Sequence, residues 1–323
     1  MRDVAHIAGV SLKTVSRVIN EEPGVASVTA TRVSDAIAEL GFERNDLARS
    51  LRQGRTSSTL GLVIEDVANP FYSAIANAVE AAARERGYLL ITASAGEDGG
   101  RERELVTALL RRRVDALLVV PAGTDHAYLG DQTPTIFLDR PPRNIAADAV
   151  LFDNTGGARR GVEHLLEHGH TRIACVLDEE GVYTHGLRLA GYRAALAAAG
   201  IEVDPVLVRT GSFDAAHAQA DVERVLALDA NRRPTAIFTT NNRSTVGALH
   251  ALATRDRTTA LVGFDDFELA DLLGTTVVRA DPWRLGQEAA ALAFARLAGD
   301  TQPPRTITVG TELVIRGSGE VEP

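Results

Sequence analysis

The fold follows from the stretch VAHIAGVSLKTVSRVIN, residues 4–20, which predicts two short helices separated by a tight turn. Val4 and Ala8 stand at helical spacing in the first helix, and Gly9 can adopt the positive φ that a tight turn needs. Ser11 can accept a hydrogen bond from the free amides at the start of the second helix. This arrangement is typical of a helix-turn-helix that reads DNA. An ordinary helical hairpin with a solvated face is the alternative.

The second helix of this stretch has two chemically different faces. Val15, Val18 and Ile19 stand at i, i+3 and i+4, so we expect them to pack against the first helix. The side chains that remain on the outside are those of Leu12, Lys13, Ser16 and Arg17. This face suits the major groove of DNA, because Lys13 can donate to guanine and Leu12 can touch a thymine methyl group.

Turn, packing and contact residues together match a known pattern. The segments DVA at 3–5, AGVS at 8–11 and TVSRVIN at 14–20 closely resemble the DNA-binding headpiece of LacI/GalR transcriptional regulators. The resemblance implies a homodimeric repressor whose headpieces bind a pseudo-palindromic operator in double-stranded DNA and whose core binds a small effector. It implies operator contacts by Leu12, Lys13, Thr14, Ser16, Arg17, Asn20, Thr29, Asn45, Ala48 and Leu51.

The beginning of the sequence departs from the family pattern. Only Met1 and Arg2 precede Asp3, whereas family members usually have several more residues there, including a Thr or Ser that caps the first helix. We therefore expect either a start codon upstream of Met1 or the loss of this cap and its phosphate contact. Gly24 occupies, by register, the place of a family side chain that can touch DNA, so we expect that contact to be lost.

A third helix and an arginine-rich segment complete the N-terminal region. Ser27 can cap the third helix and Gly41 can end it. The following segment, residues 45–56, resembles the hinge helix of the family. It is too short to be stable alone in water, so we expect it to fold only against its dimer mate and DNA. Leu47 would meet its symmetry copy and Leu51 would wedge between base pairs. A flexible linker is the alternative.

Composition indicates a globular protein whose N-terminal region carries a small net positive charge and whose remainder is acidic. The 323 residues are 45% hydrophobic, with no apolar run of the roughly 20 residues that span a membrane and no signal-peptide pattern. We therefore expect a cytoplasmic protein without a membrane partner. Residues 1–56 contain eight Lys or Arg and seven Asp or Glu, a net charge of +1, which leaves −10 for the remainder. DNA contact should therefore be limited to the N-terminal region.

From Leu60 onward, short apolar runs alternate with amphipathic helical segments. The predicted strands are residues 60–64, 89–93, 116–120, 135–138, 173–177, 206–208, 236–238 and 260–264. The predicted helices are residues 70–87, 101–112, 156–168, 185–199, 214–228 and 242–253. This alternation predicts parallel sheets with helices on both faces.

The family resemblance implies that these elements form an α/β core like that of periplasmic binding proteins, with two doubly wound parallel-sheet subdomains. We therefore predict an all-α headpiece at residues 1–44, a hinge helix and linker at 45–56, and a core at 57–323. The predicted N-subdomain comprises about 57–153 and 282–303, and the predicted C-subdomain about 154–281 and 304–317. No heptad-bearing helix follows, so a dimer without a tetramerising segment is expected.

Polar side chains follow several predicted strands, at the edge where open α/β sheets bind ligands. The resemblance places the effector pocket at Phe71, Tyr72, Asp139, Arg188, Phe213, Asn241 and Asp265. Carboxylates with Arg, Asn and aromatic rings suit a sugar or related polyol, and a nucleoside or purine would fit nearly as well. A structural ion pair between Arg188 and Asp265 is the alternative. Asn242 stands where the family more often has Asp, which should affect capping of the next helix rather than ligand binding.

Catalytic and metal sites are not indicated. His164 and His168 form an i, i+4 pair that could hold zinc, but solvated histidines at a helix end are the simpler interpretation. Cys175 lies in a predicted buried strand and is interpreted as structural. No nucleophile is paired with a base, so we expect neither an enzyme nor a cofactor. A solute-binding protein of a transport system would share the core and is the alternative function, although residues 1–56 argue against it.

Overall fold

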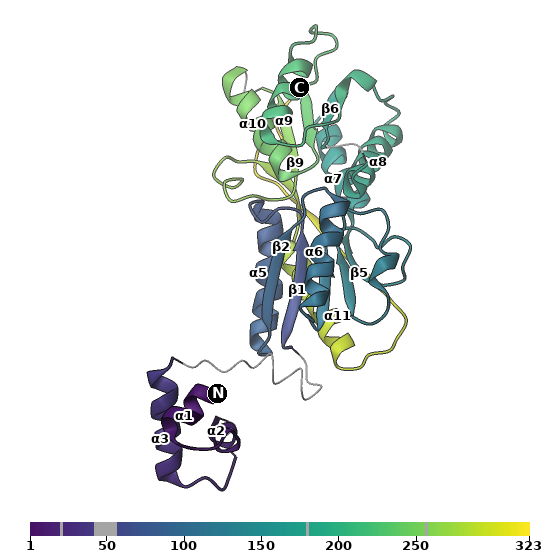
Figure 1. Ribbon diagram of the computed structural model, residues 1–323. Helices are drawn as coiled ribbons and strands as arrows, with labels where there is room; N and C mark the ends of the chain where they lie inside the picture. Colours follow the sequence, from purple (N-terminus) through teal and green to yellow (C-terminus); the bar gives the residue numbers. More distant parts are fainter. Residues whose placement is uncertain (20–21, 42–56, 179–180, 256–257) are drawn as a thin grey trace. The chain divides into compact units, whose positions relative to one another are not determined.

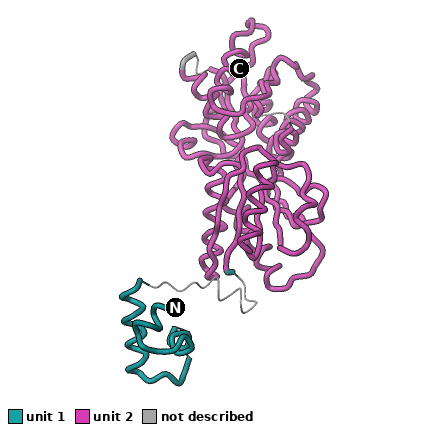
Figure 2. The backbone as a smooth tube through the Cα atoms, viewed as in Figure 1, with its two compact units in different colours: residues 1–57 teal, residues 58–323 magenta. Residues whose placement is uncertain are grey.

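The computed structural model describes residues 1–19, 22–41, 57–178, 181–255 and 258–323. The chain divides into two compact units, residues 1–57 and 58–323 (Figure 2). The predicted hinge helix, with the proposed contact residues Asn45, Ala48 and Leu51, lies outside the described residues, as does Asn20.

The N-terminal unit consists of three helices, α1 (Arg2–Ala8), α2 (Leu12–Ile19) and α3 (Ser27–Glu39), as Figure 1 shows. Their common core contains Val4, Ala5, Ala8, Val15, Val33 and Ala36. Gly9 ends α1 in the left-handed conformation with φ of 60°, and the hydroxyl of Ser11 accepts a hydrogen bond from the Thr14 amide at 3.1 Å. The predicted turn and the predicted cap of the second helix are therefore confirmed.

Two helix starts in this unit lack a side-chain cap. Met1 occupies the N-cap position of α1 and makes no side-chain cap hydrogen bond. The prediction that Ser27 caps α3 is wrong, because Ser27 is already the first helical residue and Ala26 occupies the N-cap position. The carbonyl of Ala26 instead accepts hydrogen bonds from the amides of Thr29 and Ala30.

The second unit contains two six-stranded sheets. The first has the order β11-β5-β4-β3-β1-β2 and the second the order β12-β10-β9-β8-β6-β7. The strands are β1 (Thr59–Ile64), β2 (Leu89–Ser94), β3 (Ala116–Val119), β4 (Thr135–Leu138), β5 (Asp148–Phe152), β6 (Ile173–Val176), β7 (Val208–Arg209), β8 (Ala236–Thr239), β9 (Ala260–Phe264), β10 (Thr276–Ala280), β11 (Thr306–Val309) and β12 (Thr311–Val314). All pairings are parallel except that of β10 with β12.

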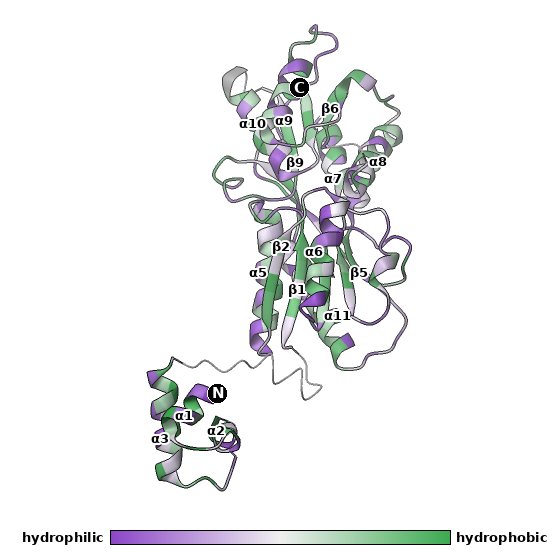
Figure 3. Ribbon diagram, viewed as in Figure 1, coloured by the Kyte–Doolittle hydropathy of each residue, from purple (hydrophilic) through white to green (hydrophobic). Residues whose placement is uncertain are grey.

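Helices cover both faces of each sheet. They are α5 (Pro70–Glu85), α6 (Gly99–Arg111), α7 (Asn154–Glu167), α8 (Tyr183–Ala198), α9 (Ala215–Leu226), α10 (Asn242–Arg255) and α11 (Pro282–Leu297), with short 3₁₀ turns at Ala127–Leu129 and Pro205–Leu207. On the first sheet α5 packs with α11 on one face and α6 lies on the other; on the second, α7 and α8 lie opposite α9 and α10. The central strands are hydrophobic along their length (Figure 3). This is expected because helices cover both faces of these strands.

The chain passes between the two subdomains three times. It crosses after β5, returns after β10, and crosses again between β11 and β12 at Gly310. The predicted assignment of residues 304–317 to the C-subdomain is therefore wrong for Thr306–Val309, which pairs with β5 in the first sheet. Gly310 divides one run of β-forming residues into two strands of different sheets, which the sequence pattern does not reveal.

Among the described residues, no helix is both long and apolar enough to cross a membrane. The predicted strand at 206–208 is instead a 3₁₀ turn followed by the two-residue strand β7. Pro205 explains the difference, because it fixes the backbone at the first position of the turn and has no amide to donate to a sheet.

Candidate functional site

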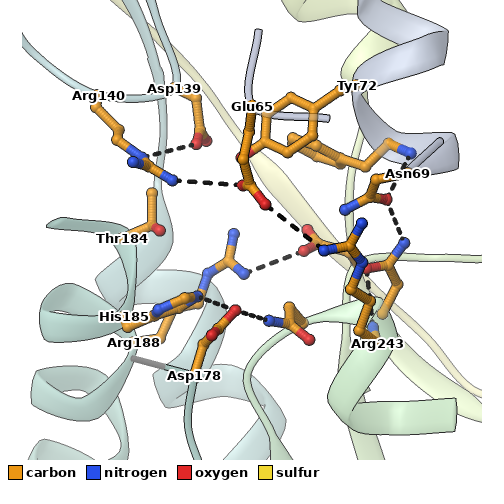
Figure 4. Close-up of a pocket in the computed structure, with 14 residues that line it drawn as sticks. Glu65, Asn69, Tyr72, Asp139, Arg140, Asp178, Thr184, His185, Arg188 and Arg243 are labelled. Carbon is orange, nitrogen blue, oxygen red and sulfur yellow. Dashed lines mark hydrogen bonds and ion pairs between the residues drawn. The ribbon is translucent and has the colours of Figure 1, made fainter. Parts of the chain in front are cut away.

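A small polar cavity of about 30 Å³ lies where the carboxyl ends of the two sheets face each other (Figure 4). From the first subdomain it is lined by Glu65, Asn69, Phe71, Tyr72, Asp139 and Arg140. From the second it is lined by Asp178, Thr184, His185, Arg188, Asn241, Asn242, Arg243 and Asp265. The volume suffices for about two water molecules. A ligand the size of a sugar therefore requires the subdomains to separate.

The structure brings together six of the seven residues predicted for the effector pocket. Phe71 and Tyr72 lie at the start of α5, Asp139 follows β4, and Asp265 follows β9. Phe213 does not line this cavity. Its side chain is half exposed and stacks on His217, with ring centroids 3.9 Å apart.

Arg188 and Asp265 form a buried ion pair within the second subdomain. Arg188 Nη1 lies 3.1 Å from Asp265 Oδ2 and also donates to the carbonyl of Thr240. Its Nε donates to Asn154 Oδ1 at 2.8 Å, and its guanidinium lies 3.8 Å from the centre of the Phe264 ring. The ion pair between Arg188 and Asp265, which was the alternative interpretation of the sequence, is therefore present. It holds the Asp265 carboxylate at the cavity wall.

Asp139 and Asp265 share two unusual features. Both have positive φ, 64° and 66°, directly after a strand, a conformation that stores strain and concentrates at functional sites. In each, Oδ1 is buried and has no hydrogen-bond partner in the described part of the chain. Burial raises the pKa of Asp139, and it raises the pKa of Asp265 to about 6 against the opposing effect of Arg188. Two buried acceptors at one cavity suit a ligand that carries hydroxyl donors.

Arg140 was not predicted as a site residue, although it directly follows Asp139. Its Nη1 and Nη2 donate to the two carboxylate oxygens of Glu97 at 2.6 and 2.5 Å, and Nη1 also donates to the carbonyl of Pro121 at 3.2 Å. Glu65 lies on its other side, and burial together with Glu97 raises the pKa of Glu65 to about 7. The available sequence signal was a charged pair immediately after a buried strand.

Asn242 and Arg243, at the start of α10, join the two subdomains. Asn242 Nδ2 donates to Asn69 Oδ1 at 2.9 Å, while Asn242 Oδ1 accepts from the Arg243 amide at 2.9 Å. Arg243 forms an ion pair with Asp66 and lies 3.6 Å from Glu65. The expectation that Asn242 affects only helix capping is therefore incomplete. We call these contacts between 242–243 and residues 65, 66 and 69 the inter-subdomain bridge.

The histidines considered for zinc have other partners. His164 Nε2 is bound to Glu320, and His168 Nδ1 lies 2.8 Å from the carbonyl oxygen of His164. The described residues contain no group of three side chains suited to a metal ion. Cys175 is fully buried, which raises the pKa of its thiol.

On the N-terminal unit, α2 presents the predicted outward face. Leu12, Lys13 and Arg17 are exposed, whereas Val15 is fully buried against α1 and α3. Thr14 and Ser16 are half-buried beside them, and Thr29 lies in the first turn of α3. The exposed residues project from one helix whose start is fixed by Ser11, as reading of a groove requires.

Comparisons with known proteins agree with both units. Residues 1–45 match the model of bacterial regulatory proteins of the lacI family, and residues 162–319 match that of a periplasmic binding protein-like domain. The chain is 33% identical over 329 residues to the ribose operon repressor of Escherichia coli K12, covering 98% of this chain and 99% of that protein. It is 28% identical to the transcriptional repressor PurR of Aliivibrio fischeri ES114, covering 98% and 97%.

Solved structures show the same relationship. The lac repressor dimer bound to operator and the anti-inducer ONPF is 26% identical, with a TM-score of 0.82 and 98% of both chains covered. The complex of the transcriptional regulator CelR with cellobiose is 32% identical, with a TM-score of 0.72 and 98% of both chains covered. With the helix-turn-helix, the two-sheet core and these relatives together, the chain belongs to the LacI family of bacterial transcriptional regulators, which are cytoplasmic DNA-binding proteins and not enzymes.

Proposed function

We propose that this regulator is a homodimeric repressor whose operator affinity is set by a sugar or related polyol in the cleft between the core subdomains. The observation that carries this proposal is a pair of buried oxygens at one cavity, Oδ1 of Asp139 and Oδ1 of Asp265, that have no hydrogen-bond partner among the described residues. Each carboxylate oxygen can accept a hydroxyl hydrogen bond, and Asn241, whose Oδ1 accepts from Ser244 and whose Nδ2 donates to Asp178, has a second Nδ2 hydrogen to donate. A polyol offers several such hydroxyl groups on a small frame.

The aromatic side chains add a second argument for a sugar. Phe71 and Tyr72 lie edge to face, with ring centroids 5.1 Å apart, and both line the cavity. A ring face can pack against the apolar face of a sugar. D-ribose is the first compound to test, because the ribose operon repressor is 33% identical over nearly the whole chain. A purine is the second, because carboxylates, an amide and aromatic rings at one cavity would fit a purine nearly as well.

The effector must act through a difference in affinity for two states of the core, because equal binding to both would shift nothing. The cavity is too small for a sugar while the inter-subdomain bridge is formed, so separation of the subdomains precedes binding. Closure on the effector then changes the relative position of the subdomains. In a dimer, this change alters the spacing of the two headpieces.

The headpieces bind operator DNA through α2, with Lys13 reading a base and Arg17 and Thr29 holding phosphates. Asn20, Asn45, Ala48 and Leu51 are further proposed contacts. Leu51 is the proposed wedge at the operator centre. Support for the dimer comes from the similarity to the lac repressor dimer bound to operator.

Calorimetry on the full chain tests the effector class. D-ribose, other aldoses and hypoxanthine are titrated into the wild type, Asp139→Asn and Asp265→Asn, with Asp271→Asn as a control for an exposed aspartate. We expect one sugar to bind the wild type and the control equally and both cavity variants at least about tenfold more weakly, a change of 1.4 kcal/mol. Binding of hypoxanthine alone, or of a sugar with equal affinity in all variants, would contradict the proposal.

A further inference from the structure

A second cavity of about 170 Å³ lies beyond the effector cavity, between the loop after β3 and the start of α8. Its walls include Pro121, Pro141, Val182 and Tyr183. Arg140 is the one described residue that lines both cavities. Figure 4 shows Arg140 at the edge of the effector cavity beside Asp139, with its guanidinium directed toward Glu65. Arg140 is therefore the partition between the two spaces.

The Arg140 side chain is held in place mainly by residues that line the outer cavity. Both terminal nitrogens of Arg140 donate to Glu97, and one also donates to the carbonyl of Pro121. Its distances to the inner carboxylates are longer, 3.7 Å to Glu65 and 3.8 Å to Asp139. All four partners belong to the first subdomain, so the partition should keep its place when the subdomains separate. Bidentate pairing with a carboxylate fixes a guanidinium more firmly than any of the other contacts.

The outer cavity has the size and chemistry of a site for one ring. An engineered protein cavity of about 150 Å³ binds benzene, so about 170 Å³ accommodates a six-membered ring. The proline, valine and tyrosine walls offer apolar surface to a sugar face or an aromatic ring, and Glu97, Thr124 and Arg143 add polar walls that can bind hydroxyl groups. A ligand with a second ring would need this space, and Arg140 separates it from the carboxylates that bind the first ring.

We propose that Arg140, positioned by Glu97, sets the length of the effector: the closed partition restricts the site to a single sugar ring, and its release joins the two cavities into a site for a two-ring ligand. This inference rests on the proposed sugar effector. Glu97 lines only the outer cavity, and its side chain is 31% exposed. It can therefore be replaced without removing a residue that contacts the first ring.

The affinities of the full chain for one-ring sugars and for their two-ring glycosides test whether Arg140 separates the two cavities. D-ribose, D-xylose, D-glucose and D-galactose are each titrated beside their 4-nitrophenyl β-glycosides into wild type, Glu97→Ala and Glu104→Ala. Glu104 is an exposed residue of α6 and serves as the matched control. For the sugar that binds, the wild type and the control should bind the glycoside at least about tenfold more weakly, and Glu97→Ala should reduce that ratio about tenfold. Equal binding of sugar and glycoside by wild type, or an unchanged ratio in Glu97→Ala, would overturn the proposal.

A crystal structure of Glu97→Ala separates this inference from the proposed function. If none of the sugars binds wild type, the sugar effector is wrong, and the partition is judged from the structure alone. We expect the Arg140 guanidinium to leave its position between Pro121 and Asp139 and the two cavities to become continuous. An Arg140 that keeps its position without Glu97 would overturn the partition, whatever the effector is.

Discussion

Replacing Asn242 by Asp tests the inter-subdomain bridge with a change of one functional group. Asn69 Oδ1 accepts from the Phe71 amide at 3.1 Å, and Asn242 Oδ1 accepts from the Arg243 amide at 2.9 Å. Both side-chain amides are thus oriented by backbone donors, which leaves Asn242 Nδ2 as the donor across the cleft. An Asp at this position keeps the contact with the Arg243 amide but places an acceptor against an acceptor.

The expected magnitude follows from this geometry. Loss of the hydrogen bond, with the buried Asn69 oxygen now facing a carboxylate, should destabilise the closed core by about 1–3 kcal/mol. That range corresponds to a shift of about 5- to 150-fold in the equilibrium between closed and open core. The bridged core has a cavity too small for a sugar, so weakening the bridge should raise the population of the open, binding-competent core and strengthen effector binding by up to the same factor.

Calorimetry with the identified effector measures this change in affinity in the full chain. Asn242→Ala removes the donor without adding a charge, so it should lie between wild type and Asn242→Asp. Asn231→Asp, at an exposed asparagine, controls for the added charge. Wild-type affinity in Asn242→Asp would show that the bridge does not keep the cleft closed against the effector.

Three further changes test other parts of the molecule. Lys13→Ala should lose about 1–3 kcal/mol of operator affinity at one base position, measured on a set of single-base operator variants; equal weakening on every variant would make Lys13 a phosphate contact. Leu51→Ala should relax the operator bend and weaken specific but not non-specific binding at one salt concentration, and an unchanged bend would mean that the segment is only a linker. Effector affinity should rise from about pH 5 to pH 7, because burial raises the pKa of Asp265 to about 6 and hydroxyl donors bind the ionised carboxylate. The neighbouring charges are Arg188, which lowers this pKa, and Asp139, which raises it. The affinity of Asp265→Asn is measured for comparison, and a wild-type affinity that stays constant over this range would contradict this role.

The headpiece was predictable because its signals are local. Gly9 and Ser11 act within one turn of chain, and α2 shows its inner and outer faces in eight residues. The alternation of apolar strands and helices likewise predicted parallel sheets covered on both faces, since the strands β1, β3, β6, β8 and β9 are buried along their whole length. The division into two sheets came from the family resemblance. Ser27 was misplaced because helix caps are decided by one residue of register, and Ala26 can fill the N-cap position through its carbonyl alone.

Tertiary contacts account for most of what the sequence did not show. The strands β5, β10, β11 and β12 were not predicted, and the last two belong to different sheets although only Gly310 separates them. Asn69, Glu97 and Arg140 acquire their roles through partners distant in sequence, such as Asn242 for Asn69. Phe213 was placed by resemblance, and the structure pairs it with His217 outside the effector cavity.

Operator affinity measured with increasing effector tests the central claim most directly. The wild-type chain should change its operator affinity by about 5- to 150-fold at saturating sugar, the usual range of allosteric coupling. Asp265→Asn should bind operator like the wild type when no sugar is added and should lose the response, because its carboxylate is a proposed sugar contact and lies in the core unit. An Asp265→Asn chain that responds to the sugar as the wild type does would contradict control of the operator through this cleft.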